Sequence, residues 1–169
     1  MDDSSYAFGS GDNHTRYGRE EYLDDAKFRL TSRHAVVSTL DATAVASVIF
    51  GATGGASGVH ERSLLFLAEL GFVAVGPFIV CLELPTLATR WVRRVDSATC
   101  FGILACPDAG SLISHGELEI SRLTLSGDML WQASGRDIFT GAISVDAEGV
   151  HVEDFNGDTY RFDLQTGRT

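Results

Sequence analysis

The sequence predicts an all-β protein, an antiparallel meander of short strands grouped into blade-like units of four. Three turn signals, Gly76-Pro77, Gly116-Glu117 and Asn156-Gly157, follow one another at equal intervals along the chain. Each lies between two apolar runs rich in β-branched residues, which is the pattern of a hairpin. Trp91 and Trp131 are separated by the same interval. A period of about 40 residues with four short strands per unit is typical of a propeller blade.

Residues 1–25 are polar and charged, and we predict that they form a mobile arm outside the repeat. Ser, Gly, Asp and Asn are frequent there, and such a composition buries little apolar surface. Four aromatic residues interrupt it, namely Tyr6, Phe8, Tyr17 and Tyr22. They favour an arm partly docked on the domain or on a partner over one that is wholly free. Residues 26–169 are predicted to form a single β-repeat domain, long enough to bury a core.

The domain is expected to begin with a hairpin outside the repeat. Residues 35–40 and 45–50 are β-prone runs separated by a short turn, and a glycine-rich loop over 51–58 follows. The expected strands of the repeat are residues 62–67, 72–75, 78–82 and 88–92, then 101–105, 111–114, 118–123 and 129–132, then 139–145, 150–152 and 159–162. A third tryptophan at the same interval would fall beyond Thr169. We therefore expect the last unit to lack its final strand.

Two phrases of the sequence resemble the blades of quinoprotein-like and WD-like β-propellers. Residues 125–131 and 162–167 have the form of a turn of D-x-x-T-G type and of a following strand that carries a Trp. The resemblance covers residues 62–169 and implies an architecture rather than an activity. The first copy departs from it, since residues 83–87 lack the turn glycine, and no set of cofactor ligands accompanies the motif. About three units imply an incomplete or open array, because propellers usually close with four or more blades.

An open array has exposed sheet edges, and such edges invite pairing with another chain. The sequence therefore favours a protein partner, or self-association into a homodimer, through an open sheet edge. The net charge of −10 and an isoelectric point near 4.8 argue against nucleic acid and anionic membranes as partners, since such binders need clustered Lys and Arg.

Targeting and redox signals point to the cytoplasm. The polar start lacks the apolar core of a signal peptide, and no run reaches the roughly 18 apolar residues of a membrane span. Three cysteines, Cys81, Cys100 and Cys106, are an odd number at irregular spacing, which indicates neither a disulfide framework nor a zinc site. A cytoplasmic protein with reduced thiols, and without cofactor or metal, is predicted.

One motif offers a competing interpretation. Residues 48–58 place a Gly-Ala-Thr-Gly-Gly run after a strand, which resembles the dinucleotide-binding fingerprint of short-chain dehydrogenases. That site needs a helix over 59–70 to receive the pyrophosphate. It also needs a Tyr-x-x-x-Lys pair downstream, whereas the only lysine, Lys27, lies upstream. A plain glycine-rich loop is the preferred interpretation.

Metal sites are considered at three places. Residues 154–158 superficially suggest a calcium loop, but they lack the EF-hand spacing, and Asn156-Gly157 between β-prone runs predicts a tight turn. The pairs His151/Glu153 and His115/Glu117 have the spacing of one strand face, yet neither has a third ligand nearby in the sequence. No metal ligand is predicted.

The repeat itself indicates where a binding site would lie. Residues 96–100 and 136–140 are equivalent connections between consecutive units, so they must emerge at the same end of the array. The candidate binding residues are Asp96, Thr99, Cys100, His115, Arg136, Asp137 and Thr140. We predict a non-catalytic binding module with no catalytic residue. The alternative is a small enzyme that uses Asp96, His115, Arg136 and Asp137, and it requires their side chains to converge in one pocket.

Overall fold

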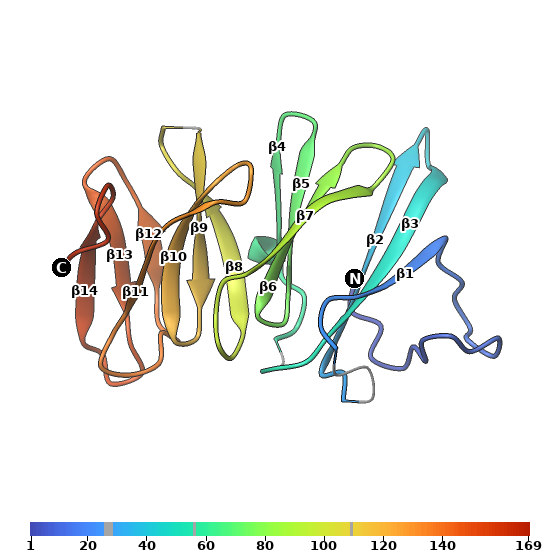
Figure 1. Ribbon diagram of the computed structural model, residues 1–169, viewed down its shortest axis with the longest axis horizontal. Coiled ribbons are helices and arrows are strands. Elements are labelled where there is room, and N and C mark those ends of the chain that lie inside the picture. Colours follow the sequence, from blue (N-terminus) through green and yellow to red (C-terminus); the bar gives the residue numbers. More distant parts are fainter. Residues whose placement is uncertain (26–28, 56, 109) are drawn as a thin grey trace.

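The strands form four sheets that stand side by side in a row, as the computed structural model shows for residues 1–25, 29–55, 57–108 and 110–169 (Figure 1). The first sheet contains, in spatial order, β1 (Arg19–Tyr22), β3 (Thr43–Ala52) and β2 (Ser32–Leu40). The second contains β4 (Leu64–Leu67), β5 (Leu70–Val75), β6 (Phe78–Glu83) and β7 (Ala88–Arg94). The third contains β8 (Cys100–Ala105), β9 (Ser111–Gly116), β10 (Glu119–Thr124) and β11 (Met129–Ser134). The fourth contains β12 (Ile143–Val145), β13 (Gly149–Glu153) and β14 (Thr159–Asp163).

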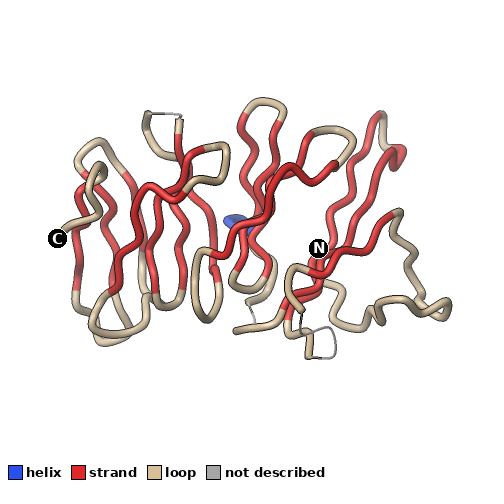
Figure 2. The backbone as a smooth tube through the Cα atoms, in the orientation of Figure 1, coloured by secondary structure: helices blue, strands red, loops and turns tan. Residues whose placement is uncertain are grey.

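The predicted fold class is confirmed. Figure 2 shows a chain dominated by strands, and every pairing is antiparallel except that of β1 with β3. Two sheets have the expected four strands in meander order, and the predicted hairpin of residues 35–50 forms most of the first sheet. Each of the three turn signals lies at or beside a hairpin turn, between β5 and β6, β9 and β10, or β13 and β14. The fourth sheet has three strands among the described residues, as expected for the last unit.

Apolar side chains fill the space between adjacent sheets. Strand β5 shows the reason: Val73 and Val75 pack toward the first sheet, while Phe72 and Ala74 pack toward the third. Successive side chains on a strand point to opposite faces, so a sheet with neighbours on both sides needs an uninterrupted apolar run. The cluster between the third and fourth sheets includes Trp131, Phe139 and Phe162.

A tryptophan–glycine contact links successive units. The Trp91 indole Nε1 donates to the carbonyl of Leu125, at 3.0 Å, and the equivalent Trp131 Nε1 donates to the carbonyl of Leu164, at 2.8 Å. The rings cover Gly127 and Gly167, whose φ angles are +89° and +67°. A Cβ at Gly127 would lie 2.7 Å from the Trp91 ring, and one at Gly167 would lie 2.6 Å from the Trp131 ring.

The first copy departs from this contact for a physical reason. Leu87 holds the position of these glycines and keeps a positive φ of 58°. One repeat interval before Trp91 the sequence has Gly51, so no indole comes from the first sheet. The Leu87 side chain is buried instead in the cluster that contains Val48 and Phe50.

The arm is docked on the first sheet through its described residues. Tyr6 is buried against Ala35 and Ile49, and its hydroxyl donates to Glu20 at 2.6 Å. Strand β1 adds to β3 in parallel, and Arg19 reaches the carbonyl of Leu87 at 2.6 Å. The aromatic residues of the arm thus cover the outer face of the first sheet. Its division from the domain at residue 25 stays a prediction, since residues 26–28 lie outside the described residues.

The helix that the competing dinucleotide interpretation requires is absent, and the bounds of the glycine-rich loop are corrected. Residues 59–70 form no α-helix: η1 (Glu61–Ser63) is one turn of 3-10 helix, and β4 follows it directly. Residues 64–67 form β4, which pairs with β5. The helix that a dinucleotide site requires is therefore absent from residues 59–70. Within the glycine-rich loop over 51–58, Gly51 and Ala52 belong to β3, and Ala56 lies outside the described residues. No helix of the described residues is long and apolar enough to cross a bilayer.

Candidate functional site

The connections between sheets gather at one end of the array, which we call the connection end, at the lower edge of Figure 1. It comprises residues 53–55 and 57–63, 95–99 and 135–142. Backbone hydrogen bonds join it to the nearby hairpin turns: Cys100 N donates to Gly76 O at 2.7 Å, Glu117 N to Thr99 O at 2.8 Å, Phe139 N to Glu117 O at 2.7 Å and Phe155 N to Ile138 O at 2.8 Å. These bonds tie the second, third and fourth sheets to one another at this end.

Asp96 is an architectural residue of this end. Its side chain is 2% exposed, and its two carboxylate oxygens accept four backbone N–H groups: Ala98 at 2.6 Å, Thr99 at 3.0 Å, Leu118 at 2.9 Å and Glu119 at 2.8 Å. Burial raises the pKa of this carboxyl, while the backbone donors oppose the rise. Gly116 gives the carboxylate its room, because a Cβ there would collide with the Oδ2 of Asp96.

Thr99 and Cys100 are enclosed in the same way. Thr99 is 1% exposed and donates through its hydroxyl to Gly76 O at 3.4 Å. Cys100 is fully buried and is the first residue of β8. The prediction that it belongs to the connection of residues 96–100 is therefore wrong. Burial raises the pKa of its thiol to about 12, so the thiolate that a nucleophile requires is not formed near neutral pH.

His115 and Thr140 line one hollow. This space of about 530 Å³ lies between the 57–62 connection and β8, and His60, Arg62 and Phe101 also contribute to it. The His115 ring is 7% exposed, and its Nε2 lies 3.0 Å from Phe139 O, which fixes that nitrogen as a donor. Burial lowers the pKa of His115 to about 4. The imidazole is therefore neutral at physiological pH and holds the β11–β12 connection in place.

Arg136 and Asp137 lie at the surface. The Asp137 carboxylate accepts from the Asn156 amide at 2.7 Å and from the Ile138 backbone at 2.8 Å. The Arg136 backbone N–H donates to the Tyr160 hydroxyl at 3.0 Å. Its guanidinium makes no hydrogen bond or ion pair to the part of the chain that the structure describes.

The four residues of the enzyme alternative do not assemble into a reaction site. No hydrogen bond or ion pair between described residues joins any two of the side chains Asp96, His115, Arg136 and Asp137. Each has a separate set of partners, and the Arg136 guanidinium has none within the described ranges. The connections do emerge at the same end, as the repeat predicts, but most of the polar residues there hold the loops together.

Sequence reasoning missed the hollow beside the open edge of β14. In the second and third sheets, β7 and β11 cover the equivalent edges, on β6 and β10. Beside β14 lies a hollow of about 720 Å³, lined by Ser134, Gly135, Arg136, Asp158, Thr159, Tyr160, Arg161 and Thr169. Only Arg136 of this set is a candidate from the sequence. The repeat could have indicated this edge, because β7 and β11 pair with the equivalent strands of the two preceding sheets.

The Asp154 carboxylate of the turn at residues 154–158 is occupied by hydrogen bonds from neighbouring residues. The Asp154 carboxylate accepts from the backbones of Asn156 and Asp158, each at 3.0 Å, and from the Tyr160 hydroxyl at 2.9 Å. It is a turn-stabilising group, not a cation ligand. In the described ranges, no group of three or more His, Cys, Asp and Glu side chains is placed to hold a metal ion.

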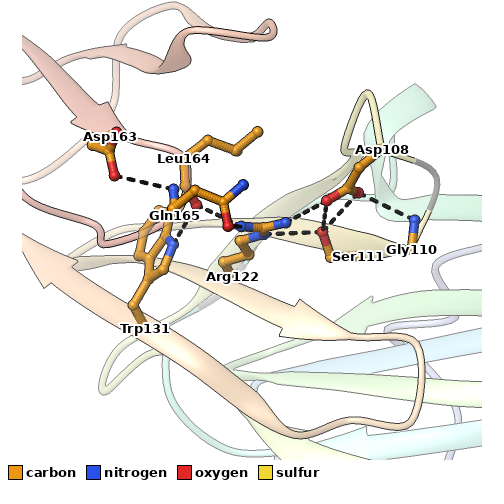
Figure 3. A network of polar contacts seen from close by, with 8 residues as sticks. All are labelled: Asp108, Gly110, Ser111, Arg122, Trp131, Asp163, Leu164 and Gln165. Atoms are coloured by element: carbon orange, nitrogen blue, oxygen red, sulfur yellow. Dashed lines mark hydrogen bonds and ion pairs between the residues drawn. The ribbon is translucent and has the colours of Figure 1, made fainter.

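A second buried charge with several partners lies near the opposite end of the array. Arg122 on β10 is 5% exposed and forms an ion pair with Asp108 (Figure 3). It also donates to the Ser111 hydroxyl at 2.9 Å and to the Leu164 carbonyl at 2.7 Å. The Leu164 carbonyl is the one that accepts from Trp131, so this network fixes the last turn onto the third sheet.

Comparisons with known proteins identify the architecture. No family model and no curated protein matches the sequence. Among solved structures, BamB from Moraxella catarrhalis, a β-propeller, superposes with a TM-score of 0.56 and 17% identity over 82% of this chain and 44% of BamB. The computationally designed Ika8 protein superposes with a TM-score of 0.55 and 13% identity over 70% of this chain and 38% of Ika8. The chain thus spans less than half the length of either, and the resemblance to propeller blades is confirmed at the level of fold.

Proposed function

We propose that this protein is a non-catalytic binding module that binds an extended segment of a partner protein along the open edge of β14. The observation that carries the proposal is the uncovered edge of β14 beside the hollow of about 720 Å³. The two preceding sheets have a strand at that place. Propeller-like structural neighbours fit a binding role for this fold.

The backbone of β14 supports strand addition. Asp163 N donates to Arg168 O at 2.8 Å, so the Asp163 N–H points away from β13 and toward the free edge. Because hydrogen-bonding direction alternates along a strand, the N–H groups of Arg161 and Thr159 face the same edge. A row of such groups binds an extended peptide through its main chain.

The experiment removes one of these donors. Peptides are selected from a random display library on the wild-type protein and then measured on Arg161→Pro and Arg161→Ala. Both variants lose the guanidinium, but only Arg161→Pro loses the outward N–H, and proline is tolerated at that position of an edge strand. We expect the selected peptides to bind Arg161→Ala and to lose at least about tenfold in affinity on Arg161→Pro. Equal binding to the two variants would exclude the β14 edge.

A second variant tests occupancy. A chain extended after Thr169 by a copy of residues 130–134 should fill its own edge, because the Arg168 carbonyl accepts from Asp163 N as the Asp128 carbonyl accepts from Thr124 N one unit earlier. This variant should bind none of the selected peptides while keeping a folded circular-dichroism spectrum. Undiminished binding would place the peptide elsewhere on the molecule.

The cytoplasmic location remains a proposal. It is supported by the three cysteines, which are unpaired and buried and therefore suit a reducing compartment. Fractionation of cells that express the tagged protein tests it directly.

A further inference from the structure

We propose that the hollow between the 57–62 connection and β8 binds the carboxylate of a small molecule that also carries an O–H or N–H donor. In this site Arg62 holds the carboxylate and His115 accepts from the donor. The hollow, of about 530 Å³, shares no lining residue with the one beside β14, so the inference goes beyond the proposed function. A 2-hydroxy acid and the C-terminal residue of a polypeptide both present the required groups.

The guanidinium of Arg62 has its carboxylate-binding groups unoccupied. Its Nη1 donates to the carbonyl of Ile143 at 3.3 Å, and it forms no ion pair with any described residue. The Nε and Nη2 atoms have no hydrogen-bond partner in the described ranges, and both are accessible to solvent. These two atoms carry parallel N–H bonds, which form the fork that binds both oxygens of a carboxylate. The bond to Ile143 therefore leaves free the donors that a carboxylate needs.

The backbone around Arg62 holds this residue in a fixed place. The Nδ1 of His60 accepts from the Arg62 backbone N–H at 3.2 Å, and the His60 Nε2 donates to the carbonyl of Phe101 at 2.6 Å. Strand β8 lies directly against Arg62, because a Cβ at Gly102 would be 2.8 Å from the Cβ of Arg62. The site is thus largely formed before a ligand arrives, which lowers the entropy cost of binding.

His115 supplies an acceptor in the same hollow. Its Nε2 donates to the carbonyl of Phe139, so the neutral ring carries its proton there and presents a lone pair on Nδ1. This Nδ1 has no partner in the part of the chain that the structure describes, and it is accessible to solvent. Burial lowers the pKa of His115, and the charge of Arg62 adds to the shift, which indicates that the guanidinium lies near this ring. A carboxylate held by Arg62 can therefore direct a neighbouring O–H or N–H at Nδ1.

The rest of the lining suits a small organic molecule. Phe101 is half-buried, and its ring meets the His115 ring edge-to-face with centroids 5.6 Å apart. Thr140 is exposed, and its hydroxyl has no partner among the described residues. An apolar wall beside a few convergent polar groups is typical of small-molecule sites, and the volume lies within their range.

The charge of the lining favours a ligand with a single negative charge. Glu61 is the acidic residue of the lining, and it is exposed. It forms no ion pair with Arg62, so it does not occupy the guanidinium. Its charge opposes a dianion more strongly than a monoanion. A monocarboxylate therefore fits this hollow better than a phosphate does.

The test compares small probes by NMR, from the shifts of residues 57–62, Phe101 and Thr140. Lactate carries both groups, propionate lacks the hydroxyl, lactamide lacks the charge, and inorganic phosphate is the dianion. We expect lactate to bind at least about tenfold more tightly than lactamide and about threefold more tightly than propionate. Phosphate should give no saturable shift at these residues.

A fifth probe distinguishes the two sources of the ligand. N-acetylalanine presents a carboxylate and an amide N–H as the end of a polypeptide does. Tighter binding than that of lactate identifies a polypeptide C-terminus as the source, and weaker binding identifies a free hydroxy acid.

Matched variants locate the site. Arg62→Gln should weaken lactate binding at least about tenfold, whereas Arg90→Gln, at an exposed arginine of β7, should leave it unchanged. A second pair keeps Arg62 in place. Gly58 lines the hollow, and a Cβ there meets no atom within 4 Å, so the fold tolerates a side chain. Gly58→Glu should bind lactate at least about fivefold more weakly than Gly58→Gln, because only the former adds a negative charge beside the site.

Three results would overturn the inference. Equal affinity of lactate and lactamide excludes a carboxylate as the recognised group. Lactate shifts that are unchanged in both Arg62→Gln and Gly58→Glu place the acid elsewhere on the molecule. Saturable binding of phosphate as tight as that of lactate, or no saturable shift with any probe, excludes this class of ligand from the hollow.

Discussion

The indole of Trp131 lies against Gly167, across the boundary between the third and fourth sheets. The same contact joins Trp91 to Gly127 one unit earlier. A residue from the outer strand of one sheet thus fixes the turn of the next, and each sheet depends on its neighbour in the manner of repeat proteins.

Replacing Gly167 by alanine should destabilise the protein by about 2–4 kcal/mol, since a positive φ and a crowded Cβ both oppose the methyl group. Gly157 is the matched control: its φ of +85° is also positive, but a Cβ there meets only the Oε1 of Glu153 at 3.9 Å. Gly157→Ala should cost about 1 kcal/mol. Urea unfolding of the two variants measures the free energy of unfolding that each one loses. Equal losses would mean that the Trp131 ring does not oppose a methyl group at position 167.

Asp96→Asn should reduce the free energy of unfolding by about 2–4 kcal/mol, because an amide nitrogen replaces an oxygen that accepts backbone N–H groups. Asp137→Asn changes the same group at the surface and should stay within about 0.5 kcal/mol of wild type. Thermal unfolding of both variants gives the comparison. A mild effect at Asp96 would contradict its architectural role at the connection end.

Stability should fall as the pH drops from 6.5 toward 4, and His115 should contribute to the fall. Its pKa is lowered to about 4 in the folded protein from 6.5, so the unfolded chain binds its proton first over that range. The His115 contribution is present above pH 6.5 and is lost through the window, by an amount on the order of 3 kcal/mol. Urea midpoints of wild type and His115→Asn between pH 4 and 7 isolate it, and parallel curves would refute it.

Arg122→Lys should cost about 2–4 kcal/mol, because a lysine cannot serve Asp108, Ser111 and Leu164 together and leaves buried acceptors unpaired. Arg90 offers the control, since its pair with Glu83 at 3.5 Å is exposed. Arg90→Lys should change stability by less than about 0.5 kcal/mol. Chemical denaturation in low and high salt distinguishes the buried pair from the exposed one.

The sequence predicts the sheets well because hairpin chemistry is local. Asn156-Gly157 and the alternation around it suffice to place β13 and β14. The repeat interval then locates Gly76 and Gly116, although Gly116 is required for a different reason, the room it leaves to the Asp96 carboxylate. Leu87 departs from the repeat, and the cause is the absence of a tryptophan at position 51.

The candidate site could not be predicted at the same level. Polar residues at a connection can bind a ligand or tie loops together, and burial decides between these roles. Asp96, Thr99 and His115 prove to be buried and bonded to backbone groups, whereas the Arg136 guanidinium is free within the described ranges. Burial of a loop residue depends on contacts between segments distant in sequence, such as Glu119 with Asp96, and no local pattern reports them.

The two outermost sheet faces differ in kind from those inside the row, and this affects how the molecule can assemble. The aromatic residues of the arm cover one of them, and the other displays Ser144, His151 and Arg161. Neither offers dry surface for another molecule to stack upon, so end-to-end polymerisation into fibres is disfavoured. Lateral contact at the strand edges remains open.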